Sequence, residues 1–263
     1  MAHPVVLIHG MWCTGSNWDR VAQGLRARGF VCHAPTLPAH ADGGDAAAVA
    51  ALSLKDYAAF LRAYIEQQNF TQPPILIGHS MGGFLAQQLA SEFDCFALVL
   101  LTPAAPAGIN GVRSKPLAAF ARALARPGFW KRAHKPSFER AQKSVVNGLP
   151  LAQQTAIYAG LVPESGRALF ELAFWWTDFG HATRIDASRV RCPVYVLSAG
   201  RDALTPAPVV RKVASLYAGA ALRHYPLRSH WVLDDDDTDD MVSEIAGWLL
   251  PLEQRAAKLV RNR

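Results

Sequence analysis

Short apolar runs that resemble buried strands alternate with helical segments along most of this chain. Val5–Ile8 and Ala97–Leu101 are two such runs, and residues 52–68 between them show the i, i+3, i+4, i+7 apolar spacing of an amphipathic helix. Continuously apolar strands are typical of a parallel sheet that is buried on both faces. Since parallel neighbours need long crossovers, the alternation predicts an α/β fold with helices on both faces of a mostly parallel sheet.

Six strands are expected in all. The other four are predicted at residues 30–34, 74–77, 193–198 and 222–225, and further helices at residues 16–28, 82–92 and 238–260. A chain of 263 residues suits one large domain with a modest insertion better than two independent enzymes.

The alternation stops between Pro103 and Val190. This stretch has helix-like patches at residues 117–124, 139–146 and 169–176, and it holds twelve Lys and Arg against five Asp and Glu. The basic residues are interleaved with apolar ones, as on solvated helix faces, and no nucleic-acid-binding motif accompanies them. We therefore expect an inserted helical region and no nucleic-acid partner.

A glycine-rich turn joins the predicted strand at 74–77 to the predicted helix at 82–92. It reads Gly78, His79, Ser80, Met81, Gly82, Gly83. In a G-x-S-x-G turn between a strand and a helix, the serine backbone is strained and the residues two positions away must be small. The serine hydroxyl then stands above the sheet at a helix N-terminus, where developing negative charge is favoured. Ser80 is therefore predicted to be a nucleophile.

Together with three other motifs, this turn gives the chain a resemblance to the α/β-hydrolase family over nearly its whole length. The motifs are His9-Gly10-Met11-Trp12, Gly200-Arg201-Asp202 and Ser229-His230-Trp231. Their order, which is oxyanion loop, Ser, Asp, His, is the family's own. The resemblance implies a hydrolase core at residues 1–102 and 191–263 and a helical cap at residues 103–190. The antiparallel strands that often come first in the family are missing, which favours six strands over eight.

Asp202 and His230 complete the predicted catalytic set. Asp202 follows the strand at 193–198, at the edge of an open parallel sheet where ligands bind. Some family members place the acid one strand earlier, but residues 101–108 contain no carboxylate. His230 lies on the loop after the strand at 222–225, whereas His224 lies within that strand and is not expected to reach Ser80.

Backbone donors for a developing oxyanion are expected beside Ser80. The N–H of Met81, directly after the nucleophile, is one. The resemblance assigns the second to Met11, with Trp12 as the alternative. Two neighbouring side chains are expected to support the loop and the turn: His9 and His79.

Aromatic side chains are concentrated late in the insertion: Phe170, Phe174, Trp175, Trp176 and Phe179. They form either the core of the cap or one wall of an acyl pocket, since ligand sites are mainly apolar. Candidate pocket residues are therefore Trp12, Trp175 and Trp176.

The resemblance implies a serine hydrolase. His230 takes the Ser80 proton and returns it to the leaving group, Asp202 orients the imidazole, and water cleaves the resulting acyl-enzyme. We expect carboxylic esters of small to medium apolar groups as small-molecule substrates. The alternatives are a thioesterase, a lactonase or a carbon–carbon bond hydrolase with the same triad, and a non-catalytic ligand receptor on this fold.

No cofactor and no metal are predicted. The carboxylates at 234–240 precede a helix whose dipole they complement, and they are expected to remain solvated. Four scattered cysteines, without a C-x-x-C pair, are interpreted as buried thiols: Cys13, Cys32, Cys95 and Cys192. No apolar run approaches the roughly 20 residues of a membrane helix. The start of the chain lacks signal-peptide features, so we expect a cytoplasmic protein. The sequence does not indicate an oligomeric state.

Overall fold

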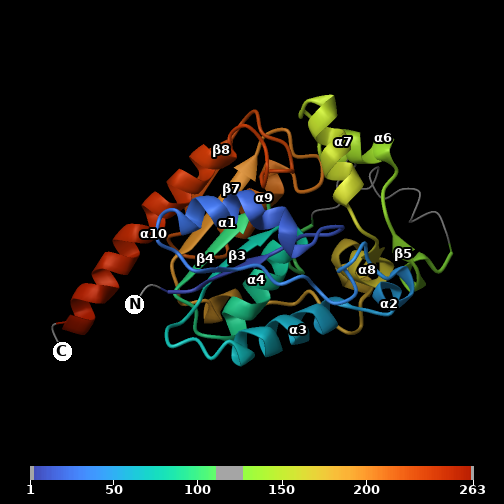
Figure 1. Cartoon of the computed structure of the whole chain (residues 1–263). Coiled ribbons are helices and arrows are strands. Elements are labelled where there is room, and N and C mark those ends of the chain that lie inside the picture. Colours follow the sequence, from blue (N-terminus) through green and yellow to red (C-terminus); the bar gives the residue numbers. More distant parts are fainter. Residues whose placement is uncertain (1–2, 111–126, 262–263) are drawn as a thin grey trace.

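Six parallel strands form the central sheet, in the order β2-β1-β3-β4-β7-β8 (Figure 1). They are β1 (Val5–Ile8), β2 (Cys32–His33), β3 (Ile75–His79), β4 (Ala97–Leu101), β7 (Val194–Ala199) and β8 (Ala221–Tyr225). The computed structural model describes residues 3–110 and 127–261. The predicted α/β fold with a six-stranded parallel sheet is confirmed.

The strands differ from the prediction only at their ends. β3 runs on to His79, which pairs with Leu101 of β4, so the strand leads directly into the turn at Ser80. β2 is shorter than the predicted strand at 30–34. It lies at the edge of the sheet and pairs only with Val5 and Val6 of β1.

Helices cover both faces of the sheet (Figure 1). α1 (Asp19–Arg26) packs against α10 (Thr238–Arg261) on one face, and α3 (Leu54–Gln67) packs against α4 (Met81–Glu92) on the other. The sequence pattern does not indicate two short helices, α2 (Ala46–Ala50) and α9 (Ala207–Ala214). Both have few turns, so their apolar spacing is too brief to stand out.

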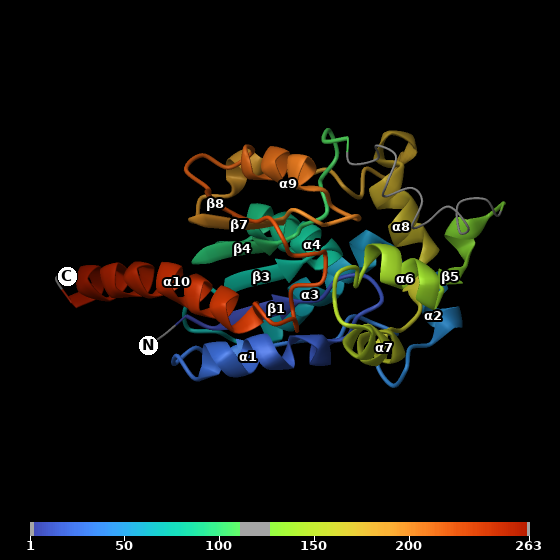
Figure 2. The ribbon, with the colours of Figure 1, turned by 90° about the horizontal axis from the view of Figure 1, so that it is seen from above.

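α10 projects past the sheet toward the C-terminus (Figure 2). It is 24 residues long, but charged side chains recur along it. Within the two described ranges, no helix has both the length and the apolar character needed to cross a membrane.

Three helices between β4 and β7, at Phe138–Ser144, Leu151–Gly160 and Gly166–Ala173, lie beyond one end of the strands (Figure 2). The patch at 139–146 corresponds to α6 (Phe138–Ser144). The patch at 169–176 corresponds to α8 (Gly166–Ala173), after which the chain tightens into a 3-10 turn at Trp175–Thr177. The patch at 117–124 lies outside the described residues.

Two features of this segment go beyond the helical insertion that we expected. One is α7 (Leu151–Gly160), which begins directly after Pro150; proline is compatible with a helix start. The other is a two-stranded antiparallel sheet of β5 (Ala133–His134) and β6 (Glu164–Ser165). Strands of two residues are too short to show an alternating pattern in the sequence.

Candidate active site

Ser80 occupies a strained turn between β3 and α4. Its φ of 54° lies in the left-handed region, which non-glycine residues rarely adopt. The turn closes so tightly that a Cβ on Gly78 would lie 2.2 Å from the carbonyl oxygen of Gly82, and a Cβ on Gly82 would lie 2.1 Å from that of Ile8. Only glycine fits at these two positions, which explains the spacing around Ser80.

Ser80, His230 and Asp202 meet at the C-terminal edge of the sheet. The Oγ atom of Ser80 lies 2.9 Å from Nε2 of His230, and Nδ1 of His230 lies 2.9 Å from Oδ2 of Asp202. His230 and Asp202 are 2% and 6% exposed, whereas Ser80 is half-buried. The structure thus brings together the three residues that the sequence selected, and Ser80 is the most exposed of the three.

The Asp202 carboxylate is held by its own loop. Oδ1 accepts hydrogen bonds from the backbone N–H groups of Leu204 and Thr205, each at 2.8 Å, and the Thr205 hydroxyl lies 2.7 Å from Oδ2. A carboxylate with this many donors is fixed in orientation. Thr205 was not among the residues expected at the site, although an Asp followed three residues later by Thr is a usable signal for such a turn.

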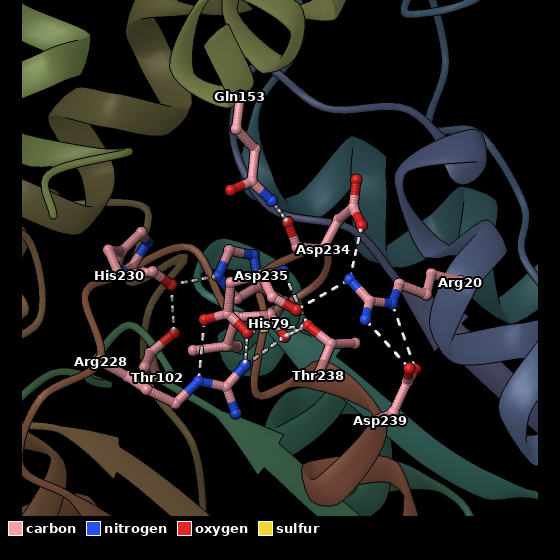
Figure 3. A network of polar contacts seen from close by, with 11 residues as sticks. Arg20, His79, Thr102, Gln153, Arg228, His230, Asp234, Asp235, Thr238 and Asp239 are labelled. Atoms are coloured by element: carbon pink, nitrogen blue, oxygen red, sulfur yellow. Dashed lines mark hydrogen bonds and ion pairs between the residues drawn. The ribbon is translucent and has the colours of Figure 1, made fainter. Parts of the chain in front are cut away.

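The backbone of His230 is held from two sides. Its carbonyl oxygen accepts a hydrogen bond from Nε2 of His79 at 3.0 Å and from the Thr102 hydroxyl at 3.3 Å (Figure 3). Burial lowers the pKa of His79 to about 3, so its imidazole is neutral and Nε2 carries the proton. Thr102, with a φ of 42°, stands at the end of β4, and nothing in its sequence context signals this contact.

The loop that carries His230 is closed by a buried ion pair. Arg228 donates to both carboxylate oxygens of Asp235, at 2.9 and 2.6 Å, and both side chains are buried (Figure 3). Asp235 therefore differs from the solvated carboxylate that we expected. Arg20 pairs with two further members of the acidic cluster, Asp234 and Asp239. Within the described part of the chain, no group of three or more His, Cys, Asp or Glu side chains is arranged to hold a metal ion.

The loop after β1 is pressed against Ser80. A Cβ on Gly10 would lie 2.9 Å from Cβ of Ser80, so the backbone beside Met11 runs close to the hydroxyl. His9 fixes this loop, since Nδ1 lies 2.9 Å from the Gly10 carbonyl oxygen and Nε2 accepts a hydrogen bond from the Leu37 N–H at 2.9 Å. Burial lowers the pKa of His9 to about 4, which keeps this ring neutral.

His224 lies away from Ser80, on the exposed strand β8. Its Nδ1 is 3.0 Å from the hydroxyl of Ser198 on β7, the residue that faces it in the sheet register. The His224 ring is therefore hydrogen-bonded to the neighbouring strand.

The insertion contacts all three loops of the site. Asn147 donates to the Arg201 carbonyl oxygen at 2.8 Å, next to Asp202, and Gln153 of α7 donates to the Asp234 carbonyl oxygen on the His230 loop (Figure 3). Trp12 provides the third link. Its indole donates to the His134 carbonyl oxygen at 3.0 Å, and its own carbonyl oxygen accepts from the Val162 N–H at 2.8 Å.

The three candidate pocket tryptophans lie in different surroundings. Trp12 is buried beside the site, while Trp175 is half-buried and Trp176 is 52% exposed. Trp175 and Trp176 stack edge to face, and Trp176 also contacts Phe174.

A separate pocket of about 620 Å³ opens between α2 and α8, lined in part by Trp130, Phe170 and Phe179. Some of the aromatic run thus lines a hollow that includes none of Ser80, Asp202 and His230.

The fold and the three converging side chains define a protein of the hydrolase type. A model of the alpha/beta hydrolase family matches residues 5–244, and the chain belongs to this family. A pimeloyl-[acyl-carrier protein] methyl ester esterase from Chromobacterium violaceum is 28% identical to it over 228 residues, which cover 86% of each chain.

Solved structures share the fold. An extracellular alpha/beta-hydrolase from a Paenibacillus species matches with a TM-score of 0.74 and 21% identity, covering 94% of this chain and 98% of the other. A methylesterase from Arabidopsis matches with a TM-score of 0.70 and 17% identity, covering 98% of this chain and 100% of the other. These likenesses extend over nearly the whole chain.

Proposed function

We propose that the protein is a serine esterase in which Ser80 is the nucleophile, His230 the general base and acid, and Asp202 the residue that orients the imidazole. One observation carries the proposal. An unbroken chain of 2.9 Å contacts leads from Ser80 Oγ through both ring nitrogens of His230 to Asp202, and it starts at a strained turn. A nucleophile, a base and an orienting carboxylate in this order are the parts that acyl transfer requires.

The positions of the protons in the site set the order of the catalytic steps. Asp202 accepts a hydrogen bond from the Nδ1–H of His230, which leaves Nε2 free to accept the Ser80 proton as Oγ attacks the ester carbonyl carbon. The resulting imidazolium is stabilised by the Asp202 carboxylate. It then protonates the departing alcohol, and a water activated in the same way by Nε2 releases the acid and restores Ser80.

The tetrahedral oxyanion is assigned to two backbone donors, the N–H groups of Met81 and Met11. Met81 is the first residue of α4, and the first N–H groups of a helix have no partner within it. Met11 follows Gly10, where an added Cβ would lie 2.9 Å from Cβ of Ser80. Donors fixed before the reaction stabilise the charge without reorganising, typically by about 3 kcal/mol for one donor.

Residues 103–190 are proposed to be a cap on a core formed by residues 1–102 and 191–263. Three contacts support this, from Asn147 to the acid loop, from Gln153 to the His230 loop and from Trp12 to the insertion. A cover held at each loop of the site limits the entry of water and of bulky substrates.

The proposed substrates are carboxylic esters with small to medium apolar groups. The side chains of Met11 and Trp12, next to Ser80, are apolar and buried. Two of the related proteins are a methyl ester esterase and a methylesterase, which supports a small alcohol as the leaving group.

A fluorophosphonate probe tests the nucleophile, because it phosphonylates an activated serine. The intact protein should gain one adduct, located on Ser80 by peptide mass spectrometry, and Ser80→Ala should gain none. A label on another residue, or an equal label on Ser80→Ala, would refute the assignment.

A substrate panel tests the reaction class. Methyl and aryl esters should be turned over with higher kcat/KM than matched thioesters, lactones or dienoic diketones. A higher kcat/KM for one of the other three classes would replace the ester assignment while keeping the nucleophile. Labelling of Ser80 with tight ligand binding and no turnover would instead indicate a receptor.

A further inference from the structure

Cys95 and Cys192 lie side by side at the end of the sheet opposite to Ser80. Cys95 precedes β4, Cys192 precedes β7, and their Sγ atoms are 3.3 Å apart. The two strands are hydrogen-bonded neighbours from this point on, with the Leu98 N–H donating to the Pro193 carbonyl oxygen at 3.0 Å. Neighbouring strands are about 4.8 Å apart, within the range of about 4.4–6.8 Å that a disulfide spans between Cα atoms.

From this geometry we propose that Cys95 and Cys192 are a modification site, a thiol pair that is oxidised reversibly to a disulfide. The sulfurs need to approach by little more than 1 Å to reach the bond length of about 2.05 Å. Both residues are half-buried, so a small disulfide compound can reach them from solvent. The pairing depends on the sheet order, because the two cysteines are 97 positions apart in the chain.

The two thiols are not equivalent. The hydrogen bond between the two thiols lowers the pKa of Cys192, and the same bond together with burial raises the pKa of Cys95. The thiolate is the attacking species in disulfide exchange. Cys192 therefore makes the first attack.

With glutathione disulfide as the oxidant, the exchange balances in two steps. The Cys192 thiolate attacks one glutathione sulfur and forms a mixed disulfide, and one glutathione leaves as a thiolate. Cys95 then gives up its proton and attacks Sγ of Cys192, which expels the second glutathione. The protein loses two hydrogens and the oxidant is recovered as two thiols.

The remaining cysteines provide an internal control. Cys13 and Cys32 are buried, and burial raises the pKa of the Cys32 thiol to about 11 and that of the Cys13 thiol higher still. A buried thiol that keeps its proton is a poor nucleophile. Oxidation should therefore select one pair out of the four.

The cross-link would close a loop that contains β4 and the whole insertion. Closing a long loop restricts the unfolded chain, which stabilises the folded one. Cys95 lies seven residues before Thr102, which stands at the end of β4 beside the Ser80 site. At about 3.3 Å per residue this separation is about 23 Å, so the disulfide forms far from Ser80. We expect oxidation to raise stability and to leave ester turnover unchanged.

The test uses the full-length protein, first reduced and then equilibrated with glutathione disulfide. Free thiols should fall from four to two. Peptide mapping without reductant should show one Cys95–Cys192 cross-link, and the unfolding midpoint should rise by at least about 3 °C. Cys95→Ser should carry one glutathione on Cys192 and show no rise in the midpoint, whereas Cys13→Ser should behave as the wild type.

Three results would overturn the proposal. They are a count of four free thiols after oxidation, separate glutathione adducts on Cys95 and Cys192 without a cross-link, and a disulfide that involves Cys13 or Cys32. None of them bears on the Ser80 assignment, because turnover is measured separately.

Discussion

The hydroxyl of Thr205 lies 2.7 Å from Oδ2 of Asp202, the same oxygen that faces Nδ1 of His230 at 2.9 Å. The backbone N–H of Thr205 donates to the other carboxylate oxygen, Oδ1, at 2.8 Å. Both oxygens are therefore directed by one neighbouring residue. The Thr205 hydroxyl also lies 3.3 Å from Nδ1 of His230, so Thr205 acts as a positioning residue at the contact between Asp202 and His230.

Thr205→Val should lower kcat/KM about tenfold, the effect expected for one hydrogen bond to a charged group. Losing this donor leaves the Asp202 carboxylate less firmly oriented toward His230, so the loss should fall on kcat and leave KM unchanged. Thr205→Ser keeps the hydroxyl and should restore kcat. A kcat in Thr205→Val equal to that of the wild type would mean that Thr205 does not position Asp202.

Ser80→Ala and His230→Ala should each reduce ester turnover by several powers of ten, because a nucleophile and its base act as a unit. His224→Ala is the matched control. The His224 ring is hydrogen-bonded to Ser198 on the neighbouring strand, so His224→Ala should retain most of the activity. Steady-state kinetics on a short-chain aryl ester, with circular dichroism to verify folding, measure the difference. Equal losses in His224→Ala and His230→Ala would contradict the assignment of the base.

Asp202→Asn keeps the shape of the acid but donates a hydrogen bond where the carboxylate accepts one. The His230 ring would then favour the tautomer that cannot accept the Ser80 proton. We expect kcat to fall about 10⁴-fold, as in the corresponding change in serine proteases. Fluorophosphonate labelling of Ser80 should slow in parallel. Activity close to that of the wild type would require a different acid.

Local patterns were sufficient to select Ser80, Asp202 and His230. Ser80 comes directly after a strand, and Asp202 and His230 lie on the loops that follow two other strands. The sheet topology brings the C-terminal ends of parallel strands to one edge. The order of the strands was not needed for this inference.

Contacts between distant segments could not be read from the sequence. Thr102 reaches His230, and Gln153 reaches Asp234, only because the folded loops are adjacent. Asp235 was expected to be solvated, yet it is buried together with Arg228, which pairs with it. A pattern of residue types does not say which carboxylate of a cluster meets an arginine.

A second buried cluster joins the insertion to the core. Glu164 of β6 accepts hydrogen bonds from the Tyr57 hydroxyl at 2.6 Å and the Ser165 N–H at 2.7 Å, and it lies 3.2 Å from Nε2 of His40. Nδ1 of His40 lies 2.8 Å from the Pro38 carbonyl oxygen. Since both ring nitrogens face acceptors, this arrangement favours the ring that carries two protons.

The pH dependence of stability follows from this ring. Burial alone would lower the pKa of His40, but the hydrogen bond and charge of Glu164, with backbone acceptors, raise it above its ordinary value. The neighbouring His9 stays neutral. The folded state then holds a proton that the unfolded chain loses near pH 6.5, so stability falls as the pH rises from about 6.5 through the folded pKa.

Urea unfolding between pH 5.5 and 8.5 measures this contribution. His40→Gln should have a lower free energy of unfolding than the wild type at low pH. The slope of this free energy against pH should lose the part that His40 supplies. Glu164→Gln keeps a polar side chain at the contact but removes the charge, and it should flatten the slope as well. His181→Gln, on an exposed turn, is the matched control and should keep the wild-type slope. An unchanged slope in His40→Gln would contradict the charged pair.

The aromatic side chains of the insertion should set a preference for longer acyl chains. Each methylene buried against an apolar wall contributes up to about 0.8 kcal/mol, or about fourfold in kcat/KM, so activity should rise from acetyl to butyryl or hexanoyl esters. Trp175 is more buried than Trp176, and its substitution by Ala should flatten the trend more strongly. Trp130→Ala alters the separate pocket between α2 and α8 and serves as the control.

Ionic strength should matter little to that preference. Two of the basic side chains of the insertion already pair with neighbours, Lys143 with Glu139 and Arg167 with Glu171, so part of the positive charge is neutralised locally. Exposed charges that remain are screened over about 10 Å at 0.1 M salt. The measurement compares kcat/KM for neutral and carboxylate-bearing esters of equal length at low and high salt. A large, salt-sensitive preference for the anionic ester without a chain-length trend would show that charge, and not the apolar wall, selects the substrate.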